Sequence, residues 1–173
     1  MDPAKAISET KRLFEPIPSR SLSQRPSTSL GPLKATTIKL DTDLPYGLAV
    51  VAYRLPGYDS PDFAAGQVLA DVLGSQRGDL YGLVPAGKAL YAGFSGESLP
   101  VATIGYALAA FPQGADGTPL IATMKDIIAA CLKNGAPEDL VEASKRHEIA
   151  DAEFEKNSIS GLANARSQAL AVD

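Results

Sequence analysis

The sequence predicts an α+β fold, in which helices pack on one side of an antiparallel β-sheet, mixed at its edge, to form a two-layer sandwich. Three observations lead to this prediction. The predicted strands come in pairs with short connections, which favours antiparallel pairing. The helical segments are grouped apart from the strands, which argues against a doubly wound parallel sheet. The length of 173 residues is that of one ordinary domain.

Four segments have the patterns of strands. Lys34–Asp41 alternates between apolar and polar residues and is predicted to be an edge strand. Tyr46–Leu55 is a more continuous apolar run with β-branched and aromatic residues, which predicts a more buried strand. Lys88–Glu97 and Thr103–Phe111 are predicted to form a second pair, because only a short connection around Pro100 separates them.

Five segments have the patterns of helices. Ser60 followed by Pro61 is typical of a helix N-terminus, and Gly74 is typical of a C-terminal end. Between them, apolar residues recur on one helical face. The other helices are expected at Ala4–Phe14, from Thr118 to Asn134, from Pro137 to Asn157, and from Ser158 onward.

The N-terminal part of the chain is predicted to be a helix and a linker that follow a preceding domain. Glu15–Pro18 ends the helix, because proline lacks a backbone N–H and restricts the residue before it. Ser19–Pro32 is rich in serine and proline, and we interpret it, with Arg20 and Arg25, as a solvated linker and not as an anion site. We therefore expect residues 1–33 to form this region. Residues 34–173 are expected to form one α+β domain, cut from a longer protein and truncated at its C-terminal end.

Composition argues against several classes of protein. The net charge of −4 and the pI near 5.0 argue against nucleic-acid binding, which needs a clustered basic face. No apolar run reaches the roughly 18–20 residues that span a bilayer. The one cysteine, Cys131, cannot form an internal disulfide. Cysteine usage therefore does not indicate whether the protein works in an oxidising or a reducing compartment. The neighbours of Cys131 are apolar, and we interpret it as a small buried residue and not as a nucleophile.

The one histidine, His147, begins the string HEIAD. A helical H-E-x-x-H would place two imidazoles on zinc, but here Asp151 stands at the second position. Aspartate can bind zinc, and residues four apart share a helix face. The flanking residues are a dense run of mixed charge, which is typical of a solvated helix surface. We therefore prefer a charged helix surface to a metal site.

Four stretches together resemble the second domain of the pitrilysin/insulinase family of zinc metallopeptidases, which includes mitochondrial-processing-peptidase subunits and paired bacterial proteins. The stretch that begins Asp79-Leu80-Tyr81 and ends at Tyr91 is similar to the family's "S-R-L-Y … L-R … G-L-A-Y" passage. The others resemble the phrase that closes the first domain, the helix after the second strand and a later helix-turn-helix. They are Lys11–Pro18, Asp62–Gly74, and Leu132–Leu140 with Lys145.

The resemblance implies a metallopeptidase-like sandwich, paired with other such units around a chamber that holds peptides. In the family, an inverted H-x-x-E-H motif in the first domain holds zinc. This chain has one histidine and no such motif, so we expect no catalytic residue, metal ligand or cofactor in it. Zinc is expected in the full-length protein or its partner. The sequence leaves the compartment unknown, and the resemblance is compatible with a bacterial-type parent that is periplasmic or otherwise extracytoplasmic, because relatives are often exported.

The resemblance also suggests one substrate contact. In active members, an Arg and a Tyr on the second domain of the half without zinc reach the substrate. Tyr91 aligns with this Tyr, and Val84 stands where the family has the Arg. Valine cannot donate a hydrogen bond to a carbonyl or an oxyanion. Either the domain belongs to the zinc-bearing half, or it comes from a proteolytically silent partner. A structural role for Tyr91 in a strand remains the simpler interpretation.

Three hypotheses of function follow. The first is a non-catalytic domain of a zinc peptidase, which forms chamber wall and the interface between halves. Its partners would be a peptide or protein substrate and the zinc-bearing domain or subunit, and a homodimer of the fragment is expected from exposed apolar surface. The second is a silent family member with an assembly or peptide-binding role. The third, an unrelated small-molecule-binding domain, requires a deep pocket lined by Tyr46–Leu55.

Overall fold

The computed structural model describes residues 2–19 and 29–172. The chain divides into two units, Met1–Pro32 and Leu33–Asp173, and each is described by itself. The first contains helix α1 (Pro3–Phe14), in which the carboxylate of Asp2 accepts a hydrogen bond from the N–H of Ala4 at 2.9 Å. Most of the predicted linker, with Arg20 and Arg25, lies outside the described residues.

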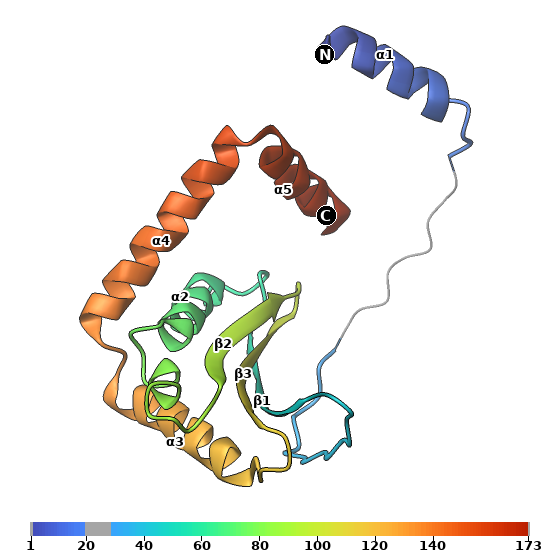
Figure 1. Ribbon diagram of the computed structural model, residues 1–173. Coiled ribbons are helices and arrows are strands. Elements are labelled where there is room, and N and C mark those ends of the chain that lie inside the picture. The colour runs from blue at the N-terminus through green and yellow to red at the C-terminus, as the bar shows by residue number, and fades with distance from the viewer. Residues whose placement is uncertain (1, 20–28, 173) are drawn as a thin grey trace. The chain divides into compact units, whose positions relative to one another are not determined.

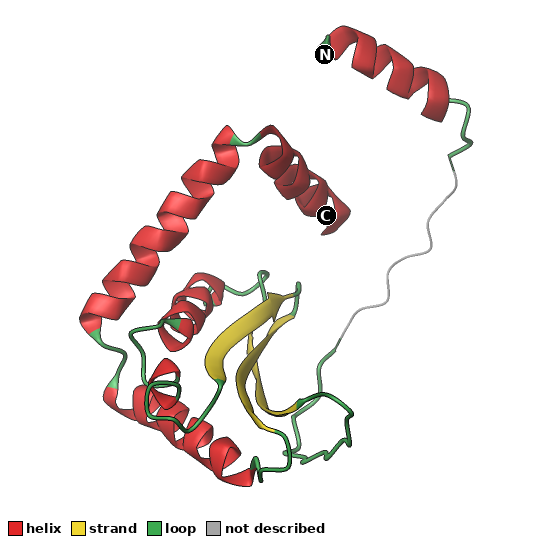
Figure 2. Ribbon diagram, viewed as in Figure 1, coloured by secondary structure: helices red, strands yellow, loops and turns green. Residues whose placement is uncertain are grey.

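The second unit is built on an antiparallel sheet of three strands (Figures 1 and 2). These are β1 (Tyr46–Pro56), β2 (Tyr91–Ser98) and β3 (Ala102–Pro112), in the order β1-β3-β2. The central strand is therefore the last of the three in sequence, and it pairs antiparallel with both neighbours. With the helices that pack on this sheet, the arrangement confirms the predicted α+β class.

The prediction of a strand at Lys34–Asp41 is wrong. This segment is extended and exposed, and it forms no ladder with a described strand. Ile38 is 75% exposed and Leu40 is 84% exposed, so the apolar half of the alternating pattern packs against little. Alternation predicts a strand only where a sheet edge pairs with the segment, and the edge of β1 does not do so here.

The hydrophobic core lies between one face of the sheet and two helices, α2 (Phe63–Gly74) and α3 (Thr118–Asn134), which lie on the same side in Figure 1. The strands contribute mainly small residues to this face, and the helices and the 3₁₀ turn η1 (Tyr81–Leu83) contribute larger ones. The buried cluster consists of Ala49, Val51, Leu73, Leu80, Leu83, Ala89, Ala92, Ala107, Ala109, Leu120, Met124 and Ile128.

Local side-chain hydrogen bonds and glycine conformation determine where α2 and α3 begin and end, and the predicted start of α2 needs one correction. Helix α2 begins at Phe63, after the expected start, because the hydroxyl of Ser60 accepts from the N–H of Asp62 and stabilises a turn instead. At α3, Asp116 accepts from both the N–H and the hydroxyl of Thr118. Gly135 ends that helix with φ of +86°, a conformation that favours glycine.

Two more helices complete the second unit, α4 (Glu138–Asn157) and α5 (Ile159–Val172). The first half of α4 packs on α2 and buries Leu140 and Ser144. Its second half continues past α2 in Figure 1, and Phe154 there is 74% exposed. No helix within the described ranges is long and apolar enough to cross a membrane.

Gly74, at the end of α2, lies directly against the backbone of β2. A Cβ at this position would stand 2.8 Å from the carbonyl oxygen of Phe94. Only glycine allows the helix and the strand to approach this closely. The residue that was expected to be a stop signal therefore has a packing role.

We predict that Met124→Ala lowers the free energy of unfolding by about 2–4 kcal/mol, because Met124 is fully buried and the truncation leaves a cavity. The matched control is Leu132→Ala on the same helix, where the side chain is 63% exposed and the change should stay within about 0.5 kcal/mol. Urea unfolding followed by circular dichroism measures both. Equal losses in the two variants would contradict this description of the core.

Candidate functional site

The face of the sheet opposite α2 and α3 is apolar and carries most of the exposed surface of the strands. Side chains alternate along each strand, so the residues that are not in the core share this second face. Four of its larger residues are 45–54% exposed, namely Leu48, Val50, Tyr91 and Ile104. We call this surface the open face. It consists of Leu48, Val50, Ala52, Tyr91, Gly93, Ile104, Tyr106, Leu108 and Ala110.

The strand register groups these residues into cross-strand rows. Tyr91, Ala110 and Leu48 form one row, and the next contains Gly93, Leu108 and Val50. Charge enters only in the row at the far end, where Glu97, Ile104 and Arg54 are aligned. Strands that are apolar on both sides are typical of sheets covered on both faces. An apolar patch of this kind marks an interaction site.

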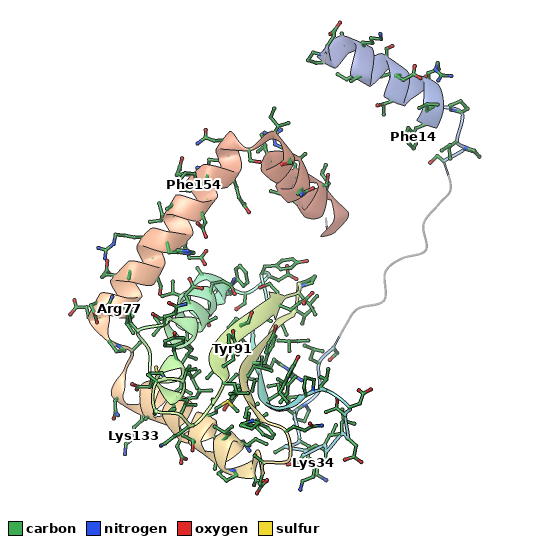
Figure 3. The ribbon with its side chains drawn as sticks, viewed as in Figure 1. Phe14, Lys34, Arg77, Tyr91, Lys133 and Phe154 are labelled. Carbon is green, nitrogen blue, oxygen red and sulfur yellow. The ribbon has the colours of Figure 1, made fainter. Side chains whose placement is uncertain are left out.

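Tyr91 is the first residue of β2 and is 54% exposed on the open face (Figure 3). Its ring extends over Gly93, because a Cβ at Gly93 would stand 3.0 Å from the Tyr91 hydroxyl oxygen. The glycine therefore makes room for the phenol. This places a hydrogen-bonding group among apolar neighbours, where it can contact a bound chain through both its ring and its hydroxyl.

Val84 has a different environment from Tyr91. It follows η1, its N–H donates to the carbonyl of Tyr81 at 2.9 Å, and it is half-buried against the core cluster. The Val84 side chain thus packs against the core, and an arginine at this position would place a charged group next to the core. The substrate-contact role of Tyr91, with Val84 at the position of the family Arg, stays a prediction.

The residues around His147 do not fit a zinc site. Its Nδ1 lies 3.3 Å from the Oδ2 of Asp151, and both side chains are more than 60% exposed on α4. Among residues 2–19 and 29–172, no group of three His, Cys, Asp or Glu side chains could hold a metal ion. Two exposed groups do not complete the three protein ligands of a catalytic zinc site.

A cavity of about 490 Å³ lies between α2, β2 and α4, on the side away from the open face. Its polar lining includes Gln67, Asp71, Arg77, Ser144 and His147. The Oδ2 atom of Asp71 is buried and has no hydrogen-bond partner in the described part of the chain. At the rim, Arg77 forms an ion pair with Asp139 of α4 (Figure 3 labels Arg77).

Asp71 of α2 faces Glu148 of α4 beside this cavity. Burial raises the pKa of Glu148, and the hydrogen bond to Asp71 and the charges of Asp71 and Asp151 raise it further, against a smaller opposite effect of His147. Two ionised carboxylates cannot hydrogen-bond to each other, so this contact requires a proton on one of the two carboxyl groups. Sequence reasoning missed this pair, because the two residues lie on separate helices far apart in the chain.

A second cavity of about 160 Å³ lies between α2, α3 and the start of α4 and includes Cys131 in its lining. Burial, with a smaller contribution from Asp79, raises the pKa of the Cys131 thiol, which disfavours the reactive thiolate. No residue of β1 lines either of these two cavities. They give no support to a small-molecule pocket along Tyr46–Leu55.

Comparison with known proteins gives structural relatives only. No family model and no curated protein matches the sequence. A protease from Helicobacter pylori superposes with a TM-score of 0.75 at 17% identity, over 98% of this chain and 43% of the other. A proposed zinc protease from Bordetella pertussis Tohama I gives a TM-score of 0.62 at 21% identity, and an inactive peptidase domain from Bordetella parapertussis gives 0.64 at 20%. Both of these matches cover 73% of this chain and 70% of the other.

The chain has the fold of a zinc-protease peptidase domain. At 17–21% identity the likeness concerns the fold alone, and it agrees with the predicted α+β arrangement. The chain spans less than half of the Helicobacter pylori protease. The geometry assigns the open face, and not the two cavities, as the candidate site of this peptidase-domain fold.

We predict that Glu148→Gln makes stability less dependent on pH. Because the pKa of Glu148 is raised from 4.5, the stability that its neutral form contributes is complete below that value and is lost as the pH rises through the raised pKa. Glutamine stays neutral. The difference in unfolding free energy, variant minus wild type, should therefore become more positive as the pH rises from about 4 towards neutrality.

Glu142→Gln is the matched control, because its contact with Lys145 lowers the pKa of Glu142. The difference between this variant and the wild type should move in the opposite direction over the same range. Thermal or urea unfolding at a series of pH values measures both. Parallel pH curves for the wild type and Glu148→Gln would contradict the proposed contact with Asp71.

Proposed function

We propose that this chain is a non-catalytic domain of a zinc-dependent metalloendopeptidase of the pitrilysin/insulinase type. In this proposal the open face forms part of the wall of a chamber that encloses peptides, and the domain also contributes to the interface between the two halves. The observation that supports it most directly is the apolar open face on a peptidase-domain fold, with Leu48, Val50, Tyr91 and Ile104 about half exposed.

The reacting groups of such a peptidase would lie outside this chain. A sequence with one histidine cannot supply H-x-x-E-H, and the aligned Arg position holds Val84. Zinc and the general base would belong to a preceding domain or to a partner subunit. This chain's contribution would be to hold an extended peptide by apolar contact, with the Tyr91 hydroxyl as a polar contact at one end of the face.

A silent family member that binds peptides or supports assembly is the second candidate. Val84 favours it, because valine cannot stabilise a developing charge on the substrate. The fold similarity to an inactive peptidase domain from Bordetella parapertussis is compatible with it. A zinc-motif subunit that becomes active only when mixed with this chain would favour the peptidase-domain proposal over the silent one.

We predict that the chain binds extended apolar peptides through the open face. The double variant Tyr91→Thr with Ile104→Thr places a residue of high strand propensity at both positions but removes much of the apolar contact area. Peptide binding measured by fluorescence anisotropy should weaken about tenfold or more, since about 1.4 kcal/mol corresponds to a factor of ten. Leu132→Thr, at a 63% exposed position on α3, is the control and should bind as the wild type does. Equal affinities of the double variant and the wild type would overturn the wall proposal.

We also predict that the isolated chain neither hydrolyses peptides nor binds zinc in a one-to-one ratio. The reason is that the described residues contain no group of three His, Cys, Asp or Glu side chains that could hold a metal ion. Isothermal titration with zinc and a quenched-fluorescent peptide assay measure the two properties. Tight stoichiometric zinc binding that is lost in His147→Ala would be the contrary result.

A further inference from the structure

The outer edge of β1 is a row of backbone groups that pairs with no other described strand. β1 pairs with β3 on its inner side over Tyr46–Pro56, and it is the first strand in the order β1-β3-β2. Within the described residues, no backbone–backbone hydrogen bond reaches its outer side. The segment before it, residues 33–45, is exposed throughout and does not cover this edge with a strand.

Over Tyr46–Tyr53 this edge lacks the features that usually prevent strand pairing between molecules, and the one charged residue of the strand, Arg54, and its proline stand at its end. Its sequence, YGLAVVAYRLP, contains no lysine or acidic residue, and its proline is the last residue. Natural edge strands are usually short, bulged, or protected by charges and prolines. The opposite edge, β2, is protected in this sense, because it is shorter and carries an acidic residue, Glu97. Of the two edges, β1 is therefore the better template for another strand.

The sequence of β1 is complementary to itself in one antiparallel register. With Val50 opposite Val50 of a second copy, Leu48 falls opposite Ala52 and Gly47 falls opposite Tyr53. These two pairs each place a large residue opposite a small one, and cross-strand aromatic contacts with glycine are favourable. The one charged residue of the strand, Arg54, falls opposite Tyr46, so like charges are not opposed. The register also keeps the open faces of both copies on the same side.

Contact area favours edge pairing over the packing of two open faces. Three strands of about ten residues cover roughly 14 Å by 30 Å, so face-to-face packing would bury only about 800 Å² in total. Stable interfaces bury about 1,200–2,000 Å². Edge pairing also buries a small area, but it adds a ladder of main-chain hydrogen bonds, which is the source of affinity in strand addition. The expected dimer is therefore weak and reversible.

We propose that the outer edge of β1 is a docking surface for β1 of a second copy of this chain, antiparallel, with Val50 opposite Val50. The pairing joins two three-stranded sheets into one continuous sheet of six strands. The two open faces then form one surface of twice the width, with both sets of helices on the other side. This dimer does not depend on the peptidase-domain proposal, because it requires neither zinc nor a substrate.

Disulfide trapping tests the register. In a Cys131→Ala background, Val50→Cys should form a disulfide-linked dimer under mild oxidation, because opposed residues have Cα atoms about 4.5–5.5 Å apart. Leu48→Cys, on the same face with nearly the same exposure, is the matched control and should not self-link, since its two copies would be about 13 Å apart. Equal trapping at both positions, or none at Val50→Cys, would overturn the register.

Sedimentation velocity over about 1–200 µM tests the dimer without new cysteines. The wild type should shift from monomer to dimer as concentration rises. Val50→Lys opposes two like charges at the centre of the pairing and should weaken the dimer at least tenfold. Val101→Lys, at a 48% exposed position between β2 and β3, should leave it unchanged. A wild type that sediments as a monomer at every concentration would end the proposal. The peptide assay uses Tyr91 and Ile104, away from this edge, so the two proposals can fail separately.

Discussion

The double pairing of β3 is the constraint on which the other parts of the second unit depend. β3 holds β1 and β2 on its two sides, and its small residues Ala107 and Ala109 are completely buried in the core. Because these side chains are short, the longer side chains of Leu80 and Met124 can reach the sheet and fill the layer. The alternation that points the alanines inward also points Ile104 and Leu108 outward, so one strand determines both the core and the open face.

An open apolar face is costly for an isolated domain, because it leaves in water the surface that folding normally buries. Its presence here agrees with a domain that works against another body, whether a peptide, a second copy or the rest of a larger assembly. The polar cavity between α2 and α4 lies on the opposite side of the sheet. The molecule thus separates an apolar contact surface from a region whose charges respond to pH, and the two can change independently in sequence.

The sequence predicted the structure correctly where the residues of a segment themselves determine its secondary structure. The apolar run at Tyr46–Leu55 predicted β1 nearly to the residue, and Gly135 was correctly placed at the end of α3. Prediction failed where structure depends on a distant partner. Lys34–Asp41 alternates as a strand should, but the sheet does not pair with it. The contact between Asp71 and Glu148 and the position of Tyr91 on the open face follow from helix packing and strand register, which no local pattern contains.

The contact of Gly74 with the carbonyl of Phe94 links these two sides mechanically. Gly74 lies one helical turn after Asp71, and Phe94 follows Gly93, over which the ring of Tyr91 extends. With no side chain between helix and strand backbone, α2 has no soft layer in which a shift could be absorbed. Any movement of α2 towards the sheet would therefore be passed directly to the backbone of β2, the strand that begins with Tyr91.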